Sequence, residues 1–219
     1  MTDTAAKKKI RVWDPIVRIG HWVLVVGFFT AYFTGDEFFQ QHLWAGYAVA
    51  ATVAIRIVWG VIGPKHARFS SFVRSPAVVF AYLSDLVKGR GKRHIGHNPA
   101  GGAMIVALLI SLAGTAGTGM ALYAVEDNKG PLAGIITAAP QQAEPAYAGA
   151  REYDDDEAEG GEHEGGGEGG EDMWEGLHSF FVYLTLALVA LHVSGVVFSS
   201  LAHKENLVRA MVTGRKRPE

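Results

Sequence analysis

Four histidines lie within long apolar stretches of the chain, and their imidazoles are the groups best suited to chemistry. They are His21, His42, His178 and His192. Ionisable groups within apolar stretches of this length are costly and usually functional, and neutral imidazole is a common metal ligand. Any one of them alone could equally be a hydrogen-bonded core histidine, so their spacing must decide between the two roles.

The spacing predicts two pairs at two depths. His178 and His192 are 14 residues apart, which is about 21 Å along a helix and close to a whole number of turns, so both face the same side. If these stretches cross a hydrocarbon core about 30 Å thick, His192 lies at the inner depth of His21, whereas His178 lies at the outer depth of His42. We therefore expect His21 to pair with His192, and His42 with His178.

Two imidazoles at one level are what a six-coordinate b-type haem requires, because the porphyrin supplies the other four nitrogens. A zinc or copper ion would instead need three or four ligands at one level. The chain has no cysteine, which excludes disulfides, cysteine-bound metal sites and covalently attached haem. The four histidines thus predict two stacked haems b, which would form an electron path across a bilayer.

Other polar residues near the predicted inner pair are candidate ligand-binding groups. Arg18 and Arg56 lie at its depth and could bind haem propionates through paired hydrogen bonds, or simply extend to the membrane surface. His97 and Asn98 precede the third apolar stretch and form a candidate quinone site. The structural alternative is that Asn98 caps a helix whose first residue is Pro99.

Four apolar stretches must position these residues. Charged residues make up only 19% of the chain, and a helix of about 20 apolar residues can cross a bilayer. The stretches predict transmembrane helices over residues 16–35, 39–62, 99–123 and 174–202. The expected fold class is all-α, an integral membrane four-helix bundle surrounded by lipid.

The positive charges predict the orientation of the bundle. Of the 20 lysines and arginines, 17 lie in the N-terminal segment, the second loop and the C-terminal segment. The third loop carries only Lys129 and Arg151, and the first loop carries none. Positively charged loops remain in the cytoplasm, so both termini are expected there.

A long acidic loop separates the third and fourth predicted helices. Residues 151–172 contain 11 of the 22 acids and seven glycines, a composition that cannot bury enough apolar surface to fold alone. We expect residues 1–123 to hold the N-terminal tail and helices 1–3, 124–173 the periplasmic loop, and 174–219 helix 4 and the cytoplasmic tail, all within one bundle domain. The loop either attracts a basic protein partner or is a solvated spacer.

The chain resembles the bacterial cytochrome b561 family, particularly the di-haem b-type subunits of nickel–iron hydrogenases. The resembling motifs are Trp13-Asp14-Pro15 with Arg18 and His21-Trp22, His42 to Gly46, Arg90 to Gly102, Leu177-His178, Leu191-His192 and Asn206 to Met211. They cover nearly the whole chain except 124–173. The resemblance implies a multi-pass protein of the bacterial inner membrane, with two haems b held by the four histidines, that exchanges electrons with quinone.

Three functions compete at this point. The favoured one is electron transfer between quinone and a periplasmic c-type cytochrome, hydrogenase or other oxidoreductase subunit, with the chain as a subunit of a complex, no catalytic residues of its own and no nucleic-acid partner. The second is a stand-alone superoxide:quinone oxidoreductase, but an anionic substrate would favour a positive outer face and this one is acidic. The third, a non-redox anchor or metal-binding protein, leaves the paired histidines unexplained.

Overall fold

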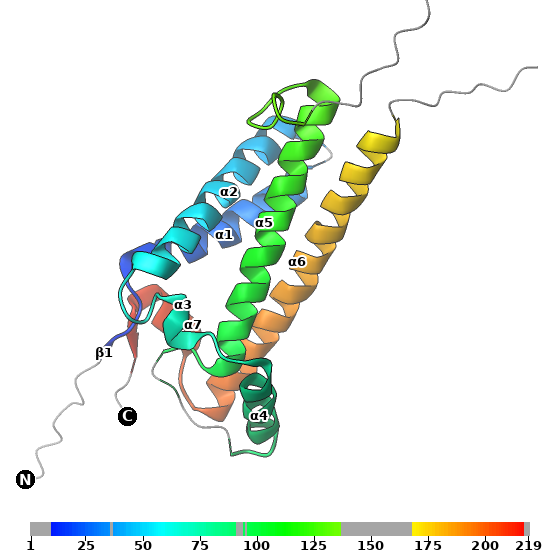
Figure 1. Ribbon diagram of the computed structural model, residues 1–219. Coiled ribbons are helices and arrows are strands. Elements are labelled where there is room, and N and C mark those ends of the chain that lie inside the picture. Colours follow the sequence, from blue (N-terminus) through cyan, green and yellow to red (C-terminus); the bar gives the residue numbers. More distant parts are fainter. Residues whose placement is uncertain (1–9, 36, 91–93, 95, 137–167, 217–219) are drawn as a thin grey trace, which may run out of the picture. The chain divides into compact units, whose positions relative to one another are not determined.

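The computed structural model describes residues 10–35, 37–90, 94, 96–136 and 168–216, and most of this part of the chain is helical (Figure 1). The helices are α1 (Pro15–Thr34), α2 (Phe39–Ile62), α3 (Phe69–Phe72), α4 (Pro76–Val87), α5 (Pro99–Asp127), α6 (Glu168–Ala202) and α7 (Leu207–Thr213). The strands β1 (Ile10–Arg11) and β2 (Arg215–Lys216) form a short antiparallel ribbon. The predicted all-α fold class is confirmed.

The four long helices, α1, α2, α5 and α6, are long and apolar enough to cross a membrane. Large apolar side chains remain exposed on them, such as Phe33 on α1, Ile62 on α2 and Leu201 on α6, which are 74%, 69% and 73% exposed. A water-soluble protein rarely exposes so much apolar surface, whereas lipid tails would cover it. The chain is therefore a multi-pass membrane protein.

Local chemistry explains where these helices begin. The Asp14 carboxylate accepts hydrogen bonds from the backbone N–H groups of Ile16 and Val17, at 2.9 and 3.1 Å, and so caps α1. Helices α5 and α6 extend to Asp127 and from Glu168, and thus enter the predicted loop 124–173 from both sides. Acidic side chains are stabilising in the first turns of a helix, which explains why the acidic start of α6 is helical. Residues 137–167 of that loop lie outside the described residues.

The chain forms two compact units, and α5 and α6 run through both. The first unit comprises residues 1–116 and 181–219, and the second comprises residues 117–180. All four long helices contribute to the core of the first unit. Its buried members are Phe28 of α1, Val49 and Val53 of α2, and Leu109 and Leu112 of α5, and the partly buried Leu186 of α6 packs against them. The predicted domain boundaries stay a prediction.

A polar contact joins α5 to α6 within the first unit. The hydroxyl oxygens of Ser111 and Thr185 lie 2.7 Å apart, and both residues are almost completely buried. Next to them, a Cβ atom on Gly114 would lie 2.4 Å from the Phe181 ring, so only glycine lets that ring come so close. Small residues and interhelical hydrogen bonds are the usual means by which membrane helices hold one another in register.

Candidate functional site

The structure brings together the two histidines predicted to form the inner pair. His21 lies on α1 and His192 on α6, and their ring centroids are 6.5 Å apart. Two imidazoles that bind one metal ion from opposite sides, through nitrogens about 2 Å from the metal, have centroids about 6 Å apart. The separation of this pair therefore fits axial ligation of one iron.

Several buried hydrogen-bond donors accompany this pair in the first unit. Arg56 Nη1, Trp59 Nε1 and the Nδ1 atoms of His21 and His97 have no hydrogen-bond partner among the described residues. A buried polar atom without a partner costs roughly 1–3 kcal/mol and calls for an explanation. A ligand that carries carboxylates, as haem does, would satisfy such donors, and Arg56 is the one predicted for this role.

His97 is held between two aromatic side chains just before α5. Its ring centroid lies 4.3 Å from that of Trp13 and 4.7 Å from that of Phe72. Burial, and then the nearby positive charges of Arg56 and Lys216, lower the pKa of His97 to about 3. The imidazole is therefore neutral at physiological pH, with one nitrogen able to donate and the other able to accept a hydrogen bond.

Asn98 has the structural role that was offered as the alternative to quinone binding. Its side-chain oxygen accepts a hydrogen bond from the backbone N–H of Gly101 at 2.7 Å, and Pro99 begins α5. This is an N-cap, and it leaves the amide NH₂ of the side chain for another partner. A quinone-binding role for His97 and Asn98 stays a prediction.

Each of the two outer histidines has its Nδ1 atom beside a hydrogen-bonding group of a neighbouring helix. In the first unit, His42 Nδ1 lies 2.9 Å from the carbonyl oxygen of Ala31 on α1. In the second unit, His178 Nδ1 lies 3.3 Å from the Thr118 hydroxyl on α5. When Nδ1–H donates to such a group, Nε2 is left for a metal, which is the common arrangement of metal-binding histidines.

Gly119 makes room for the His178 ring within the second unit. A Cβ atom on Gly119 would lie 2.9 Å from His178 Cε1, closer than side chains normally approach. Sequence reasoning did not identify Thr118, because a threonine in an apolar helix is a common packing residue. His42 and His178 belong to different units, so their pairing stays a prediction.

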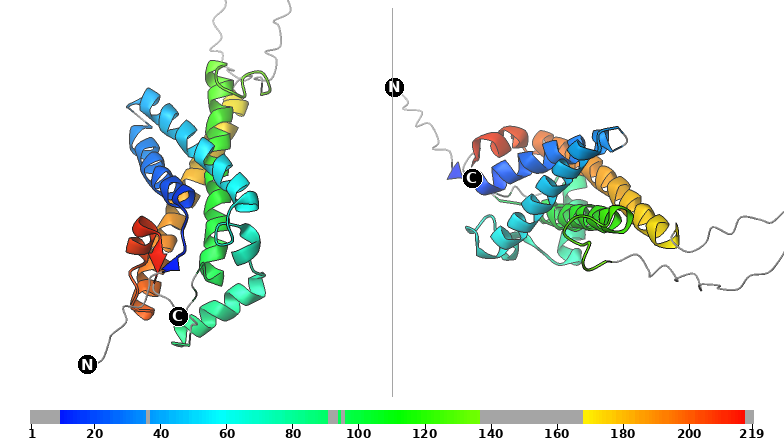
Figure 2. Two further views of the ribbon diagram at one scale, coloured as in Figure 1. Left: turned by 90° about the vertical axis from the view of Figure 1, so that its left-hand side faces the viewer. Right: turned by 90° about the horizontal axis from the view of Figure 1, so that it is seen from above.

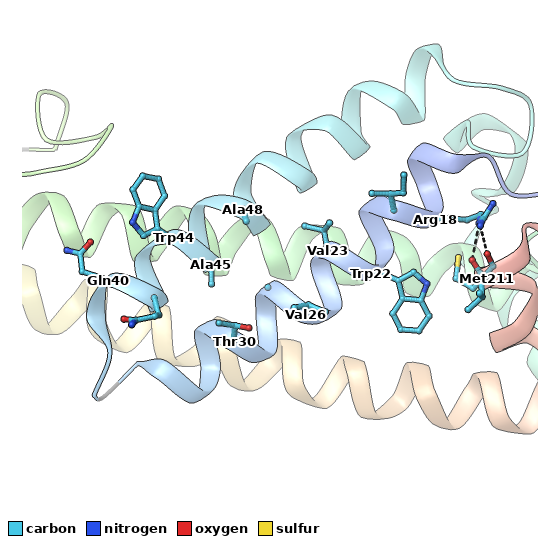
Figure 3. A pocket seen from close by; sticks show the side chains of 14 residues that line it. Arg18, Trp22, Val23, Val26, Thr30, Gln40, Trp44, Ala45, Ala48 and Met211 are labelled. Atoms are coloured by element: carbon cyan, nitrogen blue, oxygen red, sulfur yellow. Dashed lines mark hydrogen bonds between the residues drawn. The ribbon is translucent and has the colours of Figure 1, made fainter.

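Arg18 contacts the end of α7. Its guanidinium donates to the carbonyl oxygens of Met211, at 3.3 Å, and Val212 (Figure 3). A basic side chain at this position stabilises the last carbonyls of a helix. These bonds compete with the predicted haem-propionate contact of Arg18, which stays a prediction.

An open groove of about 990 Å³ begins at Arg18 and follows α1 and α2 (Figure 3). Apolar side chains such as Trp22, Val26 and Trp44 line most of its length, and Gln40 and Gln41 lie at its other end. Such a lining suits a hydrocarbon chain of the surrounding lipid better than a polar substrate.

The described residues contain no group of three histidine, cysteine, aspartate or glutamate side chains placed to hold a metal ion. Zinc and copper sites normally need at least three such ligands, whereas haem needs only the two axial ones. A membrane helical bundle with a facing imidazole pair and buried donors for carboxylates defines the class of membrane-bound b-type cytochromes.

Comparison with known families identifies the particular family. The family described as prokaryotic cytochrome b561 matches residues 12–214. The chain belongs to this family, as its motifs predicted, and its function is membrane electron transfer through haem b. The comparison with curated proteins found no match, and neither did the comparison with solved structures.

Proposed function

We propose that the chain carries electrons between a periplasmic redox protein and membrane quinone through two haems b, one near each face of the bacterial inner membrane. The observation that carries this proposal is the 6.5 Å separation of the His21 and His192 rings. By the distribution of positive charge, this pair lies at the cytoplasmic side. The second haem is assigned to His42 and His178.

In this proposal, haem b supplies a reversible one-electron centre, and the chain's residues hold it in place. The four imidazoles bind iron, and the apolar helices exclude water. Arg56 binds carboxylate at the inner site, where its Nη1 atom has no partner among the described residues. At the outer site, the Ala31 carbonyl and the Thr118 hydroxyl orient the imidazoles of His42 and His178.

Quinone would bind beside the inner haem, at His97 and Asn98. Neutral His97 can donate one N–H to a quinone oxygen, and the Asn98 amide is a second donor. The Tyr82 hydroxyl of α4 is buried, and burial raises the pKa of Tyr82 while nearby Asn98 partly offsets the rise. Tyr82 therefore remains protonated and offers a third donor close to Asn98.

Haem content and redox titration of four alanine variants test the proposal. The purified protein should contain two haems b per chain with the sharp α-band of reduced b-type haem. His21→Ala and His192→Ala should each remove one and the same haem, and His42→Ala and His178→Ala should each remove the other. If His21→Ala and His178→Ala removed the same haem, the pairing would be wrong.

The same preparations distinguish the competing functions. A protein without haem would overturn the redox function and favour a membrane anchor or metal-binding protein. Rapid consumption of superoxide with reduction of quinone would instead favour the stand-alone oxidoreductase. Electron exchange with a c-type cytochrome, without superoxide consumption, supports the proposed transfer function.

The quinone site has a separate test. His97→Ala should slow haem reduction by quinol while the optical spectrum of both haems stays unchanged. Asn98→Asp keeps the helix cap, because aspartate also caps helices, but it removes the amide donor and should therefore slow reduction by quinol as well. An unchanged rate of reduction in His97→Ala would leave His97 as a packing residue and Asn98 as a helix cap.

A further inference from the structure

The two ends of the described chain are joined in the first unit. β1 and β2 pair with Ile10 opposite Lys216, and Figure 2 shows the blue and red strands together beside α7. The Gly214 carbonyl accepts hydrogen bonds from the backbone N–H groups of Val12 and Trp13, at 2.9 and 3.3 Å. Gly214 has φ +74°, and a Cβ atom there would lie 2.8 Å from the Trp13 carbonyl oxygen. Glycine is therefore required where the ribbon meets α7.

The ribbon holds one lysine in the interior. Lys216 is only 6% exposed, whereas its neighbour Arg215 is exposed. The Lys216 ammonium lies 5.7 Å from the centroid of the Trp13 ring and 3.5 Å from the carbonyl oxygen of His94. Trp13 in turn packs on His97. Burying an ammonium group is costly, and its position inside the fold calls for a function.

Packed rings connect Lys216 with Arg56 through Trp13 and His97. The centroid of the His97 ring lies 4.7 Å from that of Phe72, which lies 5.8 Å from that of Phe69. The Arg56 guanidinium lies 5.0 Å from the centroid of the Phe69 ring. After burial, the positive charges of Arg56 and Lys216 are the largest influences that lower the pKa of His97. Two permanent cations, Arg56 and Lys216, therefore act on the same buried region, and Arg56 Nη1 has no hydrogen-bond partner among the residues described.

We propose that Lys216, held in place by the pairing of the two chain ends, is a second cationic group for the haem propionates at the inner site, together with Arg56. This inference rests on the proposed assignment of one haem to His21 and His192. Haem carries two propionates, and two separate cations match that charge. The ribbon thereby makes the two termini part of the cofactor site, and haem in turn stabilises the ribbon.

The test compares Lys216→Gln, Lys216→Arg and Arg215→Gln in the full-length protein with both haems. A nearby cation favours the reduced state of haem, which carries one positive charge less. At a fixed ambient potential, Lys216→Gln should lower the ratio of reduced to oxidised inner haem about tenfold, which is about 59 mV for one electron. Lys216→Arg keeps the charge and should remain near the original protein, and the exposed control Arg215→Gln should change neither haem.

Hydrogen exchange provides a second measurement that does not depend on activity. The backbone amides of Val12 and Trp13, which bind Gly214, should exchange faster in a His192→Ala variant that has lost the inner haem. Exchange at these amides also reports whether the ribbon remains closed in Lys216→Gln. Equal exchange with and without the inner haem would overturn the coupling between the ribbon and the cofactor.

The two levels of the proposal fail in different ways. If His192→Ala kept both haems, the assignment of the inner haem itself would be wrong. If His192→Ala lost one haem but Lys216→Gln left the potential of that haem unchanged, only the role of Lys216 would be overturned. That conclusion holds whether the ribbon is open or closed, because the charge is removed in either case.

Discussion

The histidines predicted to form the inner pair and those predicted to form the outer pair have different surroundings. At the inner site, His21 and His192 face each other at 6.5 Å, but His21 Nδ1 has no hydrogen-bond partner within the described residues. Of the two predicted outer ligands, His42 in the first unit and His178 in the second each have Nδ1 beside an oxygen of a neighbouring helix. The separation of His21 and His192 thus fits two ligands of one metal, whereas the neighbouring oxygens can fix the ring orientations of His42 and His178.

This difference has a consequence for the redox potentials. A hydrogen bond from Nδ1–H makes an imidazole a stronger electron donor and so lowers the potential of the haem it binds. The acidic loop would lower the potential of the outer haem further, whereas Arg56 and Lys216 would raise that of the inner haem. We therefore expect the outer haem to have the lower potential, which favours electron flow from a periplasmic donor towards quinone.

The largest expected effect breaks the outer site alone. Gly119→Ala places a Cβ atom 2.9 Å from His178 Cε1, which should displace the ring and remove most of the outer haem. Gly117→Ala is the matched control, because a Cβ there would meet no described atom within 4 Å beyond the adjacent helix backbone. Haem content per chain measures the difference, and equal contents in both variants would show that the ring tolerates the methyl group.

The next effect concerns the charge outside the outer site. Replacing residues 152–167 by a neutral Gly/Ser segment of equal length keeps α6, which begins at Glu168. Electron exchange with a basic c-type cytochrome should become roughly 10- to 10³-fold slower at low salt. The difference should shrink near 0.15 M salt, where the Debye length is about 8 Å. Stopped-flow measurements give the rate of electron exchange. A rate that changes neither with salt nor with the replacement would show that the loop is a spacer.

A smaller effect tests the orientation of the outer ligand. Thr118→Val removes the hydroxyl beside His178 Nδ1 and should weaken binding of the outer haem by about tenfold or more. It should also raise the potential of that haem, because the imidazole donates fewer electrons. Thr118→Ser retains the hydroxyl and should restore both properties. Haem titration and redox titration check this, and a matching change at the inner haem would contradict it.

The smallest expected effect is on the stability of the contact between α5 and α6. Thr185→Val removes the hydrogen bond to Ser111 and should lower the free energy of unfolding by about 1 kcal/mol. Ser194→Ala is the control, since the exposed Ser194 hydroxyl donates to the carbonyl oxygen of Ala190 in its own helix. Thermal unfolding in detergent measures the difference. The two haem potentials should stay unchanged, and a shift at one site alone would make Thr185 part of that site.

The sequence predicted the four long helices closely, and it missed features that depend on distant contacts. Apolar length alone placed α2 at 39–62, as observed, because a bilayer sets the number of residues a helix needs. The same criterion predicted that the third helix ends at 123 and the fourth begins at 174, whereas α5 ends at Asp127 and α6 begins at Glu168. Hydropathy does not detect helical turns made of polar residues. The β1–β2 ribbon carries no local pattern in the sequence, because each strand has two residues and its partner lies at the other end of the chain.

The sequence by itself determined the class of fold and the family, and it predicted the four histidines as ligands, because hydropathy, charge and the spacing of residues on one helix are local properties. Only the tertiary structure decided what surrounds each histidine. It set the His21–His192 separation, brought Ala31 and Thr118 beside the outer rings, and buried Lys216 near His97. These contacts depend on how each helix is rotated about its axis and where the helices cross, and both are set by the packing of side chains that are far apart in the sequence.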